Sequence, residues 1–228
     1  MPKFMKDKAI ALLDGGIESY LLGLYGLNLP SLRIRKKAET KNAPVMGMFG
    51  ASVELLVKAC LVQAYGIGSM YKSGDVDSGV FKFGTDCINE FKSAVRNDDP
   101  AVLFIWKNAD ESKDDKEILI NYLNKFKLLQ ELRANGLHAG EGCSRDVAVA
   151  TANDVYDFIV LLSKGKKLKA YLKGIPAPES TIRDREAIIE DLSRRITSKE
   201  SIESKVNTLR GMYIVLSCIS SCFWSCHG

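Results

Sequence analysis

The chain has 228 residues, 46% of them hydrophobic and 26% charged, with a net charge of +4. This is enough apolar material for one sizeable core, and so small a charge does not by itself indicate nucleic-acid binding. The charged start and the apolar stretch interrupted at 14–16 do not resemble a signal peptide. Of six cysteines, three are scattered and three crowd the last eleven residues, unlike a secreted disulfide framework, so we expect a cytoplasmic protein.

The N-terminal region is predicted to hold two helices. Apolar residues recur at three- and four-residue spacings from Lys6 to Leu27, and again from Ala43 to Tyr65. The basic connection at 33–41 is interpreted as a solvated loop in preference to a contact with a polyanion. In the second helix Glu54 and Lys58 stand four apart with the acid first, the favourable order for a helix ion pair. The pair predicts either a surface salt bridge or a part of a functional pocket.

The middle of the chain alternates loops and helices. The stretch from Gly66 to Gly84 is rich in Gly, Ser and Asp and is predicted to be a loop. Thr85 is expected to cap a short helix over 86–95. The apolar run at 101–106 fits a strand or a buried loop, and a helix from Glu117 to Leu132 follows.

The candidate chemistry lies directly after that helix, at Arg133 and His138, which have four residues between them. On a straight helix they would be about 140° apart, so convergence requires the helix to end. Gly136 predicts such an end, because glycine commonly adopts the left-handed conformation after a last helical turn. His138 would then leave a glycine-containing loop and share a pocket with Arg133. The same pattern also fits an Arg that interacts favourably with the dipole at the end of the helix, followed by a His on the surface.

The remainder is predicted to be one further core helix and a C-terminal segment. Ser144 should cap a helix over 145–164, whose broad apolar surface indicates a central position. The stretch Gly174 to Pro178 is the best linker candidate and divides the chain into domains at 5–173 and 179–228. In the second domain, residues 181–213 fit a helix-turn-helix or a packing pair of helices.

The C-terminal tail does not predict a metal site. Cys218, Cys222 and Cys226 recur every four residues, whereas zinc sites prefer one close pair and a second pair further away. A buried edge, or a chain cut before its natural end, accounts for the row better. We therefore expect no metal and no cofactor.

The order of these parts resembles the HEPN superfamily (higher eukaryotes and prokaryotes nucleotide-binding domains). A helix with Glu54 and Lys58 comes first, then an insertion, a helix ending in Arg133-x4-His138, and a nearly all-apolar helix. The stretch 42–61 resembles an uncharacterised bacterial branch found near defence genes. The resemblance covers about residues 5–173 and implies an all-α fold, an up-and-down helical bundle with a C-terminal helical appendage.

The resemblance also implies an activity, since many such proteins are metal-independent endoribonucleases of toxin and defence systems. Arg133 and His138 would be the catalytic pair of a homodimer with an RNA substrate and an antitoxin or defence-system partner, and no membrane. Ala134 stands where relatives often have a polar residue, and Asn135 comes one position later. The supporting residues would be Asn135, Glu54, Lys58 and Ser144. Two alternatives stay open: a catalytically silent interaction or nucleotide-binding module, and a DNA-binding regulator using residues 181–213.

Overall fold

The structure, a computed structural model, describes residues 5–28, 42–74, 76–102, 113–139, 143–165 and 167–178, and of 78, 113–114 and 131–139 it describes the backbone alone. Within these ranges the chain is helical, with an isolated bridge between Tyr71 and Phe81 and no strand, so the predicted all-α bundle is confirmed. The elements in order are α1 (Asp7–Asn28), α2 (Ala43–Tyr65), the short 3-10 turns η2 (Ile67–Met70) and η3 (Val76–Ser78), α3 (Gly84–Arg96), α5 (Lys113–Ala139), α6 (Arg145–Ser163) and α7 (Lys169–Leu172).

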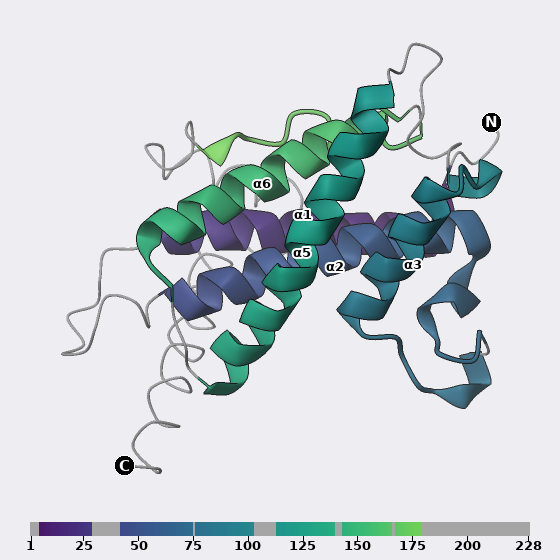
Figure 1. Cartoon of the computed structure of the whole chain (residues 1–228), viewed down its shortest axis with the longest axis horizontal. Helices are drawn as coiled ribbons and strands as arrows, with labels where there is room; N and C mark the ends of the chain where they lie inside the picture. The colour runs from purple at the N-terminus through teal and green to yellow at the C-terminus, as the bar shows by residue number, and fades with distance from the viewer. Residues whose placement is uncertain are drawn as a thin grey trace, which may run out of the picture.

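Helices α1 and α2 form an antiparallel hairpin (Figure 1). The backbone N–H of Lys6 donates to Gln63 Oε1 at 2.8 Å, which joins the start of α1 to the end of α2. Glycines of α1 allow close approach: a Cβ placed on Gly23 would lie 2.5 Å from the ring of Phe49. Both helices have the boundaries predicted from periodicity to within one residue, because a broad apolar face specifies each of them.

The centre of the bundle is α2, which packs against α1, α3, α5 and α6. We expected the helix over 145–164 to be central, and this was wrong. In α6, Val147 and Val160 are 44% and 41% exposed, and the buried residues form one stripe. The predicted contact between α2 and α6 is confirmed.

Both helices of the hairpin are long and apolar enough to cross a membrane by length and composition. Their apolar windows are 61% and 78% buried inside the bundle, as expected of core helices too. The hydropathy of α1 and α2 is therefore weak support for a membrane span.

One predicted helix start is corrected, and one predicted linker is packed against another helix. Phe83, not Thr85, precedes the first turn of α3, and its N–H donates to Asp86 Oδ2 at 3.3 Å. The proposed linker at 174–178 is packed rather than free: Ile175 is buried, and the Tyr20 hydroxyl donates to the Pro176 carbonyl at 3.0 Å. A contact 156 positions away in the chain could not be inferred from the Gly/Pro composition of that stretch.

Several predictions fall on residues outside the described ranges. These are the basic connection at 33–41, most of the apolar run at 101–106, and everything from 179 to 228, including the helix-turn-helix alternative and the cysteine row.

Candidate functional site

The candidate site centres on α5, which runs unbroken from Lys113 to Ala139. The predicted helix end at Leu132 was therefore wrong, and Gly136 lies inside the helix. Glycine in a helix interior costs only about 1 kcal/mol relative to alanine. The neighbouring leucines and alanines of 132–139 are strong helix formers and offset that cost.

The continuous helix changes the expected relation between Arg133 and His138. Both positions lie on the last turns of α5, about 140° apart around its axis. The glycine loop that was to bring them together within one copy of the chain is absent from 131–139. Asn135 lies on the same turns. Figure 1 shows α5 crossing α2 steeply and continuing past it.

Glu54 and Lys58 form the predicted pair, and it is buried between helices rather than exposed. Lys58 Nζ donates to Glu54 Oε1 at 2.6 Å, and the two side chains are only 11% and 17% exposed. A carboxylate and an ammonium removed from water need close pairing, because desolvation of an unpaired charge costs several kcal/mol. The surface alternative for this pair is thus excluded.

Gln130 and Gly84 join this pair to α5 and α3. Gln130 is buried, and its Nε2 donates to the Gly50 carbonyl of α2 at 2.7 Å. A Cβ placed on Gly84 would lie 2.9 Å from both Gln130 Oε1 and Glu54 Oε2, so the first residue of α3 packs directly on two side-chain oxygens. We call Glu54, Lys58, Gln130 and Gly84 the polar junction.

The polar junction has a favourable electrostatic arrangement. The Glu54 carboxylate lies against the first turn of α3, where the helix dipole is positive. Cys87, one turn into α3, has a thiol pKa raised to about 11, mainly by burial. The thiol is therefore protonated near neutrality and is a poor nucleophile.

Gln130 was not predicted, although the sequence carries a signal for it. The buried apolar residues of α5 recur at helical spacing through Leu119, Leu123 and Phe126, and position 130 continues that stripe. A polar residue at such a core register predicts a buried hydrogen bond. Gly84 gave no comparable signal, because its role depends on α2 and α5.

The junction lies one helical turn before Arg133. On α5, position 133 is about 60° from Gln130 in one direction around the axis, and position 138 is about 80° from it in the other. The two positions therefore flank the face through which α5 contacts α2. The hydrogen bond from Gln130 to the Gly50 carbonyl fixes α5 just before positions 133 and 138. Gln130 is the last residue of α5 whose side chain the structure describes.

Ser144 caps α6 as predicted: its Oγ accepts from the Val147 N–H at 3.3 Å. The start of α6 is also tied to the other helices. Asn42 donates to the Cys143 carbonyl at 2.7 Å, and Arg145 donates to the Leu27 carbonyl at 2.6 Å. Residues 144–147 are exposed, so this helix N-terminus faces solvent in a fixed position.

The described residues hold no group of three or more His, Cys, Asp or Glu side chains that could bind a metal ion. Comparison of the chain with known protein families, with curated proteins and with solved structures finds no match.

Proposed function

We propose that the chain is a metal-independent endoribonuclease of bacterial defence or toxin type, active in the cytoplasm as a homodimer. The observation that supports this most is the location of Arg133 and His138 on the last turns of a helix anchored one turn earlier by the polar junction. The ordered N-terminus of α6 adds exposed N–H groups suited to a phosphate.

The chemistry needs few protein groups, because RNA carries its own nucleophile. The 2′-oxygen attacks phosphorus, the P–O5′ bond breaks, and a 2′,3′-cyclic phosphate and a 5′-hydroxyl result. A base removes the 2′-hydroxyl proton and an acid protonates the leaving 5′-oxygen, roles that imidazole fills near neutral pH. Arg133 would bind the phosphate oxygens and stabilise their developing charge.

The unbroken α5 strengthens the case for two copies. Attack and departure occur on opposite sides of the phosphorus, and one imidazole reaches both poorly. Within one copy, Arg133 and His138 diverge by about 140°. Two α5 ends meeting at a two-fold axis would supply Arg133 from one copy and His138 from the partner subunit on each side of one phosphate.

The direct test is cleavage of a mixed-sequence RNA by the wild type and by His138→Ala. We expect cleavage that persists in EDTA, cyclic-phosphate ends, and loss of turnover in the variant with RNA binding retained. His227→Ala, which removes the only other histidine, is the matched control and should stay active. Activity lost on chelation and restored by magnesium would contradict the proposal, as would an active His138→Ala.

The second candidate is a catalytically silent module that binds a partner protein or a nucleotide. It is favoured by the same continuous helix, because one copy alone does not bring Arg133 and His138 together. A wild type that stays monomeric and leaves RNA intact would support this candidate. The DNA-binding alternative concerns residues 181–213, outside the described ranges.

A further inference from the structure

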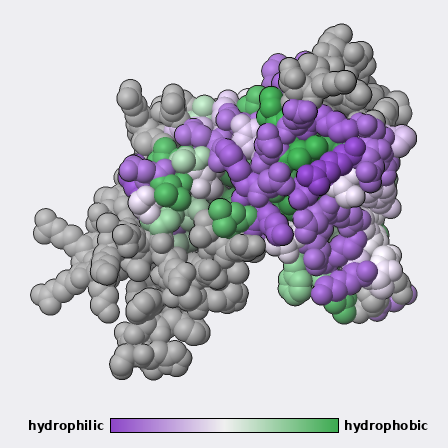
Figure 2. Space-filling view, viewed as in Figure 1, coloured by the Kyte–Doolittle hydropathy of each residue, from purple (hydrophilic) through white to green (hydrophobic). Residues whose placement is uncertain are grey.

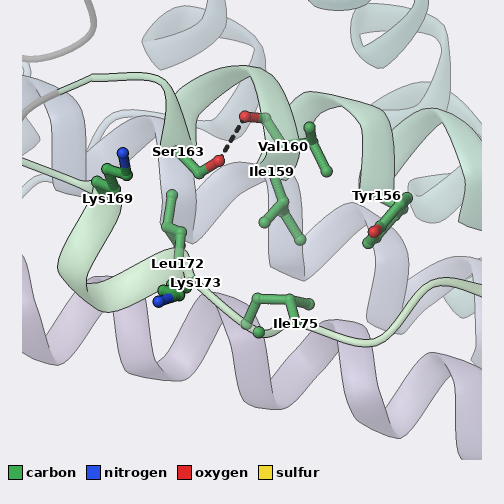
Figure 3. A pocket seen from close by; sticks show the side chains of 9 residues that line it. Tyr156, Ile159, Val160, Ser163, Lys169, Leu172, Lys173 and Ile175 are labelled. Carbon is green, nitrogen blue, oxygen red and sulfur yellow. Dashed lines mark hydrogen bonds between the residues drawn. The ribbon is translucent and has the colours of Figure 1, made fainter.

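A hollow of about 220 Å³ lies between α6, α7 and the segment that follows α7. Its wall is mainly aliphatic, built from Ile159, Val160, Leu172 and Ile175, and Tyr156 and Ser163 also line it (Figure 3). One water occupies about 30 Å³ of liquid, so the hollow corresponds to about seven waters and has room for a small organic molecule.

The walls of the hollow are held in place by contacts from outside it. Gly174 has a φ of 81°, a left-handed conformation that suits glycine and turns the chain back after α7. The next residues then cross α1, where Tyr20 donates to the Pro176 carbonyl and Ile175 is buried. The hollow is therefore formed without a ligand.

Two lysines stand at the α7 end of the hollow, as Figure 3 shows for Lys169 and Lys173. Lys169 is the first residue of α7, and Lys173 is the residue directly after this short helix. Within the described part of the chain neither forms an ion pair, whereas Lys164 is paired with Asp115 at 2.7 Å.

The surroundings add positive potential to that end. No acidic residue occurs from 158 to 178. Asp157, just before that stretch, accepts a hydrogen bond from Tyr122 at 3.1 Å. Lys167 has a lowered pKa, caused first by burial and then by the charge of Lys6.

We propose that this hollow binds a small aliphatic anion, with the chain against Ile159, Leu172 and Ile175 and the acid group at Lys169 and Lys173. The aliphatic part of the wall would contact the apolar body of the ligand, and the two ammonium groups, which form no ion pair with the described residues, would bind its acid group. Carboxylate and phosphate head groups share this chemistry. The site is separate from the polar junction and does not depend on the ribonuclease proposal.

The test is a titration of the full chain with octanoate, followed by NMR of the Ile159 and Ile175 methyl groups. We expect saturable shifts, and binding about fivefold weaker in Lys169→Gln/Lys173→Gln, since two exposed ion pairs at about 0.5 kcal/mol each contribute about 1 kcal/mol. Neutral octanol should also bind more weakly than octanoate. Octyl phosphate distinguishes the head groups: tighter binding than octanoate identifies phosphate as the preferred acid, and weaker binding identifies carboxylate.

Two variants serve as controls. Lys125→Gln/Lys127→Gln removes the same charge from α5 and should bind octanoate as the wild type does. Val160→Trp enlarges an exposed rim position and should block the hollow while leaving the circular dichroism spectrum unchanged. Absence of saturable methyl shifts in the wild type would overturn the proposal, as would equal affinity in the Lys169/Lys173 variant. Contacts from Ile175 to residues 179–228 that persist at saturating octanoate would also overturn it, because the chain itself would then fill the hollow.

Discussion

The Glu54–Lys58 pair is the residue-scale feature on which the interior of the bundle depends most. Its charges are nearly excluded from water, and Gln130 and Gly84 close the space around them. Loss of one partner leaves the other charged in a poorly solvated site. Replacement of both charged residues leaves a site that is neutral but imperfectly filled.

We expect Lys58→Met to lower the free energy of unfolding by about 3 kcal/mol, because it leaves the Glu54 carboxylate uncompensated. Urea unfolding at neutral pH measures this. The double variant Glu54→Gln/Lys58→Met should recover part of the loss. As control, Lys125→Met breaks an ion pair with Asp154 whose lysine is 57% exposed, and should cost less than about 1 kcal/mol. Equal losses for Lys58→Met and Lys125→Met would show that the buried pair is solvated.

The buried cysteines predict a stability loss at high pH. Burial raises the pKa of Cys60 to about 12 and that of Cys87 to about 11, from an ordinary value of 9.0. Above pH 9 the unfolded chain releases these protons while the folded chain keeps them, so stability falls as pH rises toward 11. In urea unfolding between pH 8 and 11, the free energy of unfolding of Cys87→Ala should fall less steeply with pH than that of the wild type. If the variant and the wild type showed the same pH dependence, the Cys87 thiol would ionise as easily in the folded chain as in the unfolded one.

At the scale of elements, the α1–α2 hairpin relies on glycine at specific contacts. A Cβ on Gly23 would lie 2.5 Å from the fully buried Phe49 ring, whereas one on Gly15 would meet only Leu55 at 3.4 Å. Both glycines lie in α1, so replacing either one with alanine gains the same intrinsic helix propensity. They differ in whether the opposite helix can accept a methyl group.

We therefore expect opposite effects on thermal stability. Gly15→Ala should stabilise by about 0.5–1 kcal/mol through helix propensity. Gly23→Ala should destabilise by about 1–2 kcal/mol, because overpacking against a rigid ring exceeds that gain. Thermal unfolding of both variants tests this, and equal stabilisation would indicate that the helices lie further apart.

Gly136 tests the continuity of α5 at the proposed catalytic residues. In an uninterrupted helix, Gly136→Ala should raise the free energy of unfolding by about 0.5–1 kcal/mol. A left-handed glycine would make the same change destabilising, since alanine strains at positive φ. Chemical unfolding of the variant distinguishes the two, and a destabilised protein would restore the loop geometry predicted from the sequence.

At the scale of the whole molecule, the exposed surface is mixed. The described part of the face in Figure 2 is mainly hydrophilic, with hydrophobic residues in small scattered groups. Leu128, for example, is 58% exposed on α5. On the described part of this face, the apolar groups are not continuous, as the apolar area of a large permanent interface would be.

The ribonuclease proposal predicts a dimer whose activity depends on both copies. Because one phosphate needs His138 of both copies, a mixed dimer of wild type and His138→Ala should be inactive, so exchange with excess His138→Ala should lower the turnover per wild-type chain. Light scattering should give twice the chain mass of 25.2 kDa. A fully active monomer, or an unchanged turnover per wild-type chain in a mixture shown to exchange subunits, would contradict the shared site.

The sequence by itself determined the helical class, the extents of α1, α2 and α6, the Ser144 cap and the Glu54–Lys58 pair. Each follows from interactions between residues no more than a few positions apart, such as apolar spacing, capping and i,i+4 pairing. Such short-range terms can be read along the chain.

Only the tertiary structure decided which helix is central, where the polar junction lies, and that 174–178 is packed. The bond from Gln130 to Gly50 spans 80 positions, and the one from Tyr20 to Pro176 spans 156. The continuation of α5 through Gly136 likewise depended on a balance between a glycine penalty and the gain from further helical turns. These outcomes depend on partners that periodicity along the chain does not identify, since a buried stripe predicts a neighbouring helix without specifying which one.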